Sequence, residues 1–348
     1  MATQYGSISG SSTSKHLTQD ENDWVTNRHT ALTKQGTIAK NLYDILSDST
    51  TGGVIDLYGR SYSFSGFDDG PYLVTATSSE NLTIRGRGMG STSIVRHEGP
   101  QDALLEIVGT IGVITFSNLT ISSSDIVIKI TNSGGDSIGG IVFDNVELAG
   151  MTAGVIDGLV LSRNIGFVIF KDCLIRNSTL GAFVSSNCTL MMTGCTIIET
   201  AQGSFIPGKS LSEFNVDTAI IQNNVFEYKS LTTDFNSLVL FANRSVVNDN
   251  VFIHNTDGAN DYYPIYGDID VCCANRIRRD DPVTNDSRPA IYLRTGKSVV
   301  ADNLITEHQY IVKLSALSND NYIGFNHAPN GSNLVHDLGS GNVVKTIF

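Results

Sequence analysis

The chain has 348 residues, of which 41% are hydrophobic and 17% charged, and its net charge is −12. This length can bury a sizeable core in one large domain or two ordinary ones. The negative charge argues against binding of nucleic acid through a basic face, and no apolar run is long enough to span a membrane. No stretch shows the periodicity of a long amphipathic helix, so the sequence indicates a nearly all-β protein.

Residues 1–35 are rich in Ser, Thr, Gln, Asn and Asp and carry the single tryptophan, Trp24. They contain no apolar segment of the kind found in a secretory signal. We predict an extended N-terminal arm that anchors the protein in a larger assembly, and the open alternative is that the arm folds back on its own body.

Residues 36–70 have the features of an N-terminal cap with the first coil of a solenoid. Ile38–Leu46 reads as a short amphipathic helix, and a break at Gly52-Gly53 leads into an apolar strand at Val54–Leu57. Because the end of a solenoid needs covering, we predict that the short helix caps the first coil.

One short pattern then recurs through the rest of the chain, residues 71–348. An apolar strand leads through a polar residue to a pivot, which is Asn or Cys, and a second apolar strand follows. Nine pivots are spaced 22 to 29 residues apart, at Asn118, Asn145, Cys173, Cys195, Asn224, Asn250, Asn275, Asn303 and Asn326. A propeller would repeat at about 40 residues. The pattern predicts a single-stranded, right-handed parallel β-helix.

Asparagine suits the pivot for two physical reasons. It tolerates the left-handed backbone conformation that a sharp turn requires, and stacked amides can bond to one another along a ladder. Cys173 and Cys195 would replace the amides as small apolar groups in two consecutive coils, and Asn81 is an earlier copy of the pivot. We predict buried free thiols for the five cysteines.

The entry segment Gly52–Phe64, which reads GGVIDLYGRSYSF, and the Asn ladder together resemble the pectate-lyase-like superfamily, and particularly its bacteriophage tailspike branch. The likeness covers roughly residues 36–348. It implies the solenoid architecture, association as a homotrimer and contact with polysaccharide, but such a fold hosts several chemistries.

The densest cluster of polar and aromatic side chains lies between residues 257 and 281. Asp268 and Asp270 are two apart on an expected strand, so both should project to one face, and they are the candidate catalytic pair of a glycan hydrolase or lyase. Nearby aromatic and acidic residues are candidate carbohydrate contacts, namely Asp257, Asp261, Tyr262, Tyr263 and Tyr266. The competing interpretation is that these carboxylates are solvated turn residues.

Aspartate precedes the pivot in four coils, at Asp144, Asp172, Asp249 and Asp302. A line of bound metal ions is one interpretation, but the preference of Asp for turns explains the pattern without them. We predict neither a metal nor a cofactor.

Two adjacent positions before each pivot are mostly apolar, although successive side chains on a strand point to opposite faces. The positions four before the pivot are Ile114, Ile141, Ile169, Met191, Ile220, Val246, Val271 and Val299, and most residues that follow them are also apolar. One face is therefore expected to be covered from outside, either by a partner subunit in a trimer or by loops.

Three functions remain open at this level. The sequence favours a structural, spike-like virion protein, made in the host cytoplasm, that binds other virion proteins through residues 1–35 and contacts host surface glycan. The second is a depolymerase of host capsule or lipopolysaccharide built on the same body. The third is a free-standing bacterial glycan lyase or hydrolase.

Overall fold

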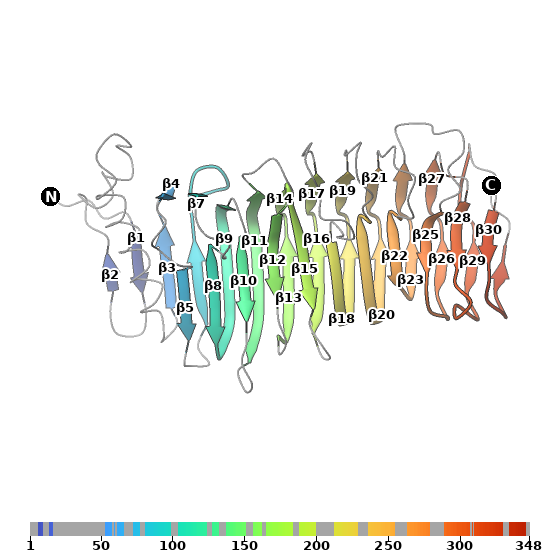
Figure 1. Ribbon diagram of the computed structural model, residues 1–348, viewed down its shortest axis with the longest axis horizontal. Helices are drawn as coiled ribbons and strands as arrows, with labels where there is room; N and C mark the ends of the chain where they lie inside the picture. The colour runs from blue at the N-terminus through green and yellow to red at the C-terminus, as the bar shows by residue number, and fades with distance from the viewer. Residues whose placement is uncertain are drawn as a thin grey trace. The chain divides into compact units, whose positions relative to one another are not determined.

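The protein is an all-β parallel solenoid in its computed structural model (Figure 1). The structure describes residues 6–9, 14–16, 53–57, 59, 61–65, 72–76, 81–98, 104–123, 127–131, 137–150, 156–161, 165–183, 188–199, 212–228, 236–254, 263–278, 289–306, 308, 310–329 and 334–345. No helix occurs within these ranges, and the predicted capping helix lies outside them.

The chain divides into two compact units, residues 1–152 with 156–178 and residues 153–155 with 179–348. The first unit contains β1 Gly6–Ser9, β2 Ser14–His16, β3 Gly53–Leu57, β4 Ser61–Ser65, β5 Tyr72–Ala76, β6 Leu82–Arg85, β7 Ser93–Glu98, β8 Leu105–Gly109, β9 Ile111–Ser123, β10 Ile128–Thr131, β11 Ile138–Gly150, β12 Ile156–Leu161, β13 Phe167–Lys171 and β14 Leu174–Arg176.

The second unit begins within β15. It contains β15 Ser178–Phe183, β16 Thr189–Thr193, β17 Thr196–Glu199, β18 Ser212–Gln222, β19 Val225–Tyr228, β20 Leu238–Asn248, β21 Val251–His254, β22 Ile265–Asp268, β23 Val271–Cys273, β24 Arg276–Arg278, β25 Pro289–Leu293, β26 Val299–Ala301, β27 Leu304–Thr306, β28 Tyr310–Leu314, β29 Tyr322–Gly324, β30 Leu334–Asp337 and β31 Val343–Val344.

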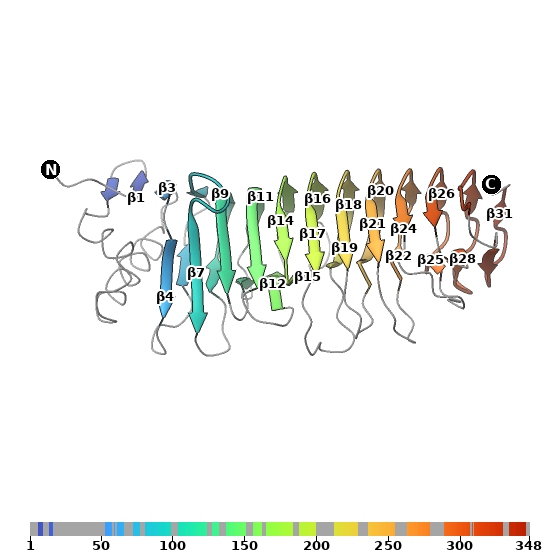
Figure 2. The same cartoon turned by 90° about the horizontal axis from the view of Figure 1, so that it is seen from above.

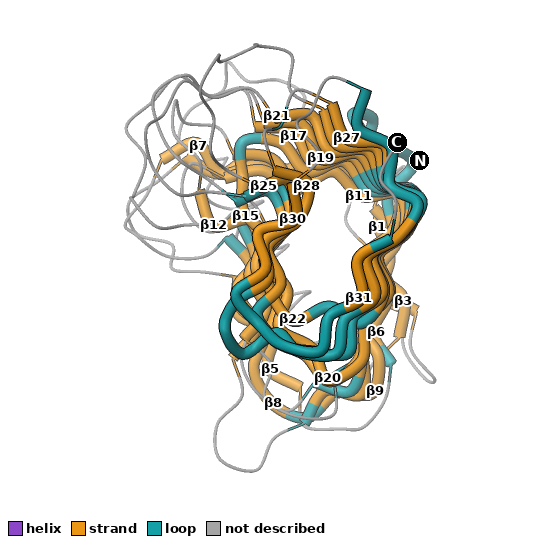
Figure 3. Tube along the Cα trace, turned by 90° about the vertical axis from the view of Figure 1, so that its right-hand side faces the viewer, coloured by secondary structure: helices purple, strands orange, loops and turns teal. Residues whose placement is uncertain are grey.

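The described strands of the second unit form three parallel walls. The first wall contains β16, β23, β26, β29 and β31, and the second contains β17, β19, β21, β24 and β27. The third contains β15, β22, β25, β28 and β30, while β18 and β20 are long enough to bend from the third wall into the first. Figure 2 shows β17, β19, β21 and β24 as one row, and Figure 3 shows the stacked coils end-on.

Residues 1–35 include two described strands. β1 pairs antiparallel with β2 and, on its other edge, antiparallel with β3 of the first coil. A segment of the predicted arm therefore lies along the solenoid as part of a hairpin, while the division of the chain at residues 35 and 70 stays a prediction.

The core consists of inward side chains stacked from coil to coil. In the first unit Phe116, Phe143 and Phe170 are fully buried and stack with ring centroids 5.2 and 5.0 Å apart. Phe226 and Phe252 form a similar pair in the second unit, at 4.7 Å. One coil cannot bury such a ring alone, so the core is stable only as an array.

The pivot prediction is correct in part. The sequence assigned the left-handed turn and the amide ladder to one position of each coil, whereas the structure divides them between two neighbouring positions. The left-handed residue is the pivot Asn itself in only two coils, at Asn118 (φ 54°) and Asn145 (φ 56°). At each later pivot the preceding residue takes this conformation instead, at Asp172, Gly194, Asn223, Asp249, Ala274, Asp302 and Phe325. Four strand pairings and the isolated bridge between Leu304 and His327 place six pivots of the second unit in one column, namely Cys195, Asn224, Asn250, Asn275, Asn303 and Asn326.

This column in the second unit is a fully bonded amide ladder. Asn275 is completely buried, and its Oδ1 accepts both the backbone N–H and the Nδ2–H of Asn250, each at 3.0 Å. Its own Nδ2 donates to Oδ1 of Asn303 at 3.0 Å and to the carbonyl oxygen of Val247 at 2.9 Å. Every polar atom of the amide is satisfied, as burial requires.

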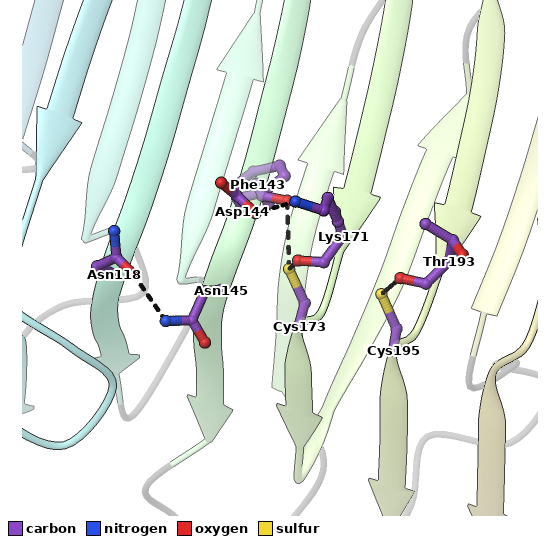
Figure 4. Close-up of polar contacts among 8 residues, drawn as sticks. All are labelled: Asn118, Phe143, Asp144, Asn145, Lys171, Cys173, Thr193 and Cys195. Carbon is purple, nitrogen blue, oxygen red and sulfur yellow. Dashed lines mark hydrogen bonds and ion pairs between the residues drawn. The ribbon is translucent and has the colours of Figure 1, made fainter.

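The first unit uses a simpler contact. Asn145 Nδ2 donates to Oδ1 of Asn118 at 2.7 Å, as Figure 4 shows. Leu119 and Val146, both fully buried, pair with each other in the strand register, and continuing the β11–β14 register places Val146 opposite the pivot Cys173. Asn81 is not a copy of Asn118, since it lies opposite Val113 and its Oδ1 accepts the N–H of that residue at 2.8 Å.

The cysteines are free thiols, as predicted, and all except the half-buried Cys273 are buried. The Cys173 thiol donates to the carbonyl oxygens of Phe143 and Lys171, and the Cys195 thiol donates to that of Thr193 (Figure 4). Burial raises the pKa of the Cys188 thiol to about 11, so these groups act as small apolar side chains with weak donors.

Glycine substitutions test whether the ladder position and the left-handed turn position have different roles. Asn275→Gly removes a buried amide and leaves its partners unsatisfied, so we expect it to lower the free energy of unfolding by about 3 kcal/mol. Asn145→Gly places glycine at a left-handed position and should cost less than about 1 kcal/mol. Chemical denaturation of both variants measures the difference, and equal losses would contradict the division of roles.

Candidate functional site

The third wall of the second unit carries a cluster of outward aromatic and cationic side chains. The strand register brings Tyr266, Tyr292, Lys313 and His336 to equivalent positions of successive coils. Phe241 lies opposite Asp268 on the neighbouring strand. We call Phe241, Tyr263, Tyr266, Tyr292, Arg294 and Lys313 the Tyr–cation wall.

The rings of the Tyr–cation wall pack mainly on one another. Tyr263 stacks on Tyr266 with centroids 5.7 Å apart, and Tyr292 lies 5.0 and 5.2 Å from these two rings. Phe241 meets Tyr266 edge to face at 6.1 Å. Such contacts stabilise the wall. Tyr263 is buried within it, whereas Phe241, Tyr266 and Tyr292 are half-buried and can meet a ligand.

Two cations lie over rings of the wall. The Arg294 guanidinium carbon lies 4.8 Å from the centroid of Phe241, and Lys313 Nζ lies 5.1 Å from that of Tyr292. Arg294 is exposed and Lys313 is half-buried. These distances are those of cation–π contacts, which fix the charged groups in place at the surface.

Asp268 is the carboxylate of this wall. Gly267, which precedes it, has φ +141°, and a Cβ there would lie 1.8 Å from the carbonyl oxygen of Leu240, so the backbone path into Asp268 requires glycine. The Oδ1 atom of Asp268 is buried and has no hydrogen-bond partner. Burial raises the pKa of Asp268, while the charge of Arg294 and a hydrogen bond from Thr295 act in the opposite direction.

Asp270 is held differently from Asp268. Strand β22 ends at Asp268 and β23 begins at Val271, with the buried Ile269 between the two carboxylates, so they do not share a continuous strand. Asp270 Oδ2 accepts the N–H of Ser245 at 2.8 Å, and the Asp270 N–H donates to the Ser245 hydroxyl at 2.9 Å. This reciprocal pair joins adjacent coils.

The other predicted contacts divide between described and undescribed residues. Tyr263 and Tyr266 belong to the wall, whereas Asp257, Asp261 and Tyr262 lie outside the described residues. Sequence reasoning missed Phe241, Tyr292, Arg294 and Lys313 because it searched within one coil. Tyr292 follows Tyr266 by 26 residues, which is one coil period, and that spacing was the available signal.

A second feature of this unit is an outward apolar column on its first wall. Met191, Ile220, Val246, Val271, Val299, Tyr322 and Val343 occupy matching positions of successive strands. Met191, Val299 and Val343 are 40, 38 and 46% exposed, and the other members are half-buried.

The predicted apolar positions four residues before the pivot therefore point outward in the second unit. The residue that follows each of them faces the core. In the first unit Ile114 and Ile141 are fully buried, because the pivots Asn118 and Asn145, from which these positions were counted, lie one residue before the buried pair Leu119 and Val146. The expectation of an external face fails for these two positions.

Other acidic clusters have structural partners. Glu147 is buried, accepts a hydrogen bond from the Thr120 hydroxyl at 2.8 Å and binds Arg176 Nε at 2.6 Å. Within the described residues no group of three or more His, Cys, Asp or Glu side chains could hold a metal ion. Nor does the described chain contain a helix long and apolar enough to cross a membrane.

Comparison of the chain with models of known protein families, with curated proteins and with solved structures finds no significant match. Its function must therefore be inferred from the two surfaces just described.

The raised pKa of Asp268 gives a pH-dependent prediction. Below the unfolded-state pKa of about 3.9 the residue is protonated in both states and costs nothing. As the pH rises through the higher folded-state pKa, ionisation penalises the folded state and stability is lost. We expect Asp268→Asn to be more stable than the parent at neutral pH, with this advantage disappearing at acid pH. Thermal melts across pH measure this, and a difference independent of pH would contradict it.

Proposed function

We propose that this protein is a structural virion protein of a tailed bacteriophage, a spike-like component that contacts glycan on the host surface through the Tyr–cation wall. The observation that carries the proposal is this wall, where phenol groups and fixed cations recur at one-coil intervals on a stack of parallel strands. A glycan chain is itself a linear repeat, and a repeating row of polar groups suits it.

The proposal includes the finer fold assignment. The entry segment at residues 52–64 resembles that of pectate-lyase-like proteins, and the amide ladder is of the kind expected for them. We accordingly assign right-handed winding and the tailspike branch of that superfamily as parts of the same hypothesis.

Attachment to the particle is assigned to residues 1–35. Within the described part of this region, β2 is the outer strand of the hairpin that β1 anchors to β3. An outer strand edge can accept a strand from another protein, so this hairpin is where we expect other virion proteins to bind.

Association into a homotrimer is assigned to the outer apolar column. Seven apolar or aromatic side chains in register form a continuous outward surface on the first wall of the second unit. On a protein with a net charge of −12, such a surface favours contact with a copy of itself over contact with water.

Glycan contact is tested by binding of purified polysaccharides from candidate host bacteria. Tyr292→Ala removes the ring that joins the two other tyrosines to Lys313, and we expect at least a tenfold weaker affinity. Phe325→Ala, which removes an exposed aromatic ring outside both the Tyr–cation wall and the outer apolar column, is the matched control and should bind as the parent does. Calorimetry measures both, and equal affinity of the two variants would contradict the assignment of the wall.

The trimer is tested by the native mass in solution. Val271→Glu places a charge in the outer apolar column and should convert a species of about three times 37.5 kDa to monomer, as measured by light scattering. Val251→Glu is the control, because it lies on the second wall opposite Arg276. A parent protein that is already monomeric would contradict the assignment.

The alternative function is a depolymerase of host capsule or lipopolysaccharide. The observation that favours it is Asp268, since a carboxyl group with a raised pKa is suited to act as a general acid. Release of shorter glycan chains by the parent, lost in Asp268→Asn, would establish it. Asp270→Asn is less decisive, because Asp270 also joins two coils.

A further inference from the structure

Within the described part of the chain, the cations of the Tyr–cation wall differ from many others in having no carboxylate in contact. Within the described residues neither Arg294 nor Lys313 forms an ion pair, and each rests on an aromatic ring instead. Elsewhere cations face acids across adjacent coils, as in the pairs Arg85–Asp56, Lys129–Glu106, Lys171–Asp144, Arg176–Glu147 and Arg244–Asp217.

Asp268 is the acid whose charge acts on Arg294, although the two groups form no ion pair at contact distance. Asp268 is half-buried, with one oxygen enclosed by protein. Asp337, on the last strand of the same wall, accepts hydrogen bonds from the Gly339 N–H and from Asn342 Nδ2, at 2.9 and 2.7 Å. Among the described residues, no carboxylate forms an ion pair with the outward charge of Arg294 or Lys313, in a protein of net charge −12.

The chemistry of these groups selects a type of ligand. An aromatic ring beneath a guanidinium holds its plane and leaves its edge free to bond a carboxylate with two N–H groups. An ammonium group is a point charge that attracts any nearby anion. The tyrosine rings pack on one another, and a cation lies over Phe241 and another over Tyr292, which reduces the aromatic surface available to a neutral sugar.

We propose that the glycan bound by the Tyr–cation wall is acidic, carrying carboxylate groups that Arg294 and Lys313 recognise. This inference rests on the proposed function and narrows it to a substrate class. The tyrosines supply hydroxyl groups along the same row. Lys313 lies on β28 and Arg294 directly follows β25 of the adjacent coil, so the two cations set the spacing of the recognised anions.

The experiment compares matched forms of the same polymers. Binding is measured by calorimetry for acidic capsular polysaccharides of candidate hosts and for alginate and hyaluronan, each in native form and after chemical reduction of its carboxyl groups. Dextran serves as the neutral polymer. We expect binding to at least one native polymer, at least a tenfold loss on its reduction, and further weakening as salt rises.

Variants identify the groups responsible. Arg294→Gln and Lys313→Gln should each weaken binding of the native acidic polymer at least fivefold, with melting temperatures near that of the parent. Arg276→Gln removes the same charge from the exposed second wall and should bind as the parent does.

The outcomes separate this inference from the proposed function. Equal affinity for native and reduced forms, or tight binding of dextran, would overturn the acidic specificity and leave glycan contact standing. Failure to bind every polymer, acidic or neutral, would overturn glycan contact and the specificity together. An equal loss in Arg276→Gln would show that general charge, and not the wall, attracts the polymer.

Discussion

The buried amide ladder is the interaction on which the second unit depends. Each interior Asn accepts from the preceding coil with one oxygen and donates forward and backward with one nitrogen, so the amides fix neighbouring coils at the same place. A shift of any coil by one residue would leave buried donors and acceptors without partners, at about 1–3 kcal/mol for each group. The ladder therefore sets the register, and the register sets what every other side chain faces.

Because the register is fixed, residues of one type that recur once per coil form a continuous surface. Once the coils are aligned, side chains about 22 to 29 residues apart in sequence become neighbours, and each wall acquires its own character. The first wall presents apolar side chains and the third presents phenols and cations. Because both surfaces are built on strands, the groups are held with little conformational freedom, which favours recognition of a partner with its own regular spacing.

Polar residues have different duties at different points of a coil. Asp172, Asp249 and Asp302 occupy left-handed turns, a conformation that Asp tolerates, whereas Asp144 precedes the left-handed Asn145 and forms an ion pair with Lys171. Asp270 joins two coils through Ser245, whereas Asp268 has a buried oxygen with no partner. Two carboxylates two residues apart thus differ in their chemistry, and only Asp268 has the environment of a group that could transfer a proton.

The sequence by itself determined the parallel solenoid, its period and most of the ladder, because apolar strands and turn residues recur with a narrow spacing that only stacked coils explain. It also located Tyr263, Tyr266 and Asp268. It could not assign the column of each pivot, since Asn suits both a left-handed turn and a buried ladder, and the two differ by one residue. Tyr292, Arg294 and Lys313 joined the site only through the strand register, because loops of unequal length separate the coils and hide which residues become neighbours.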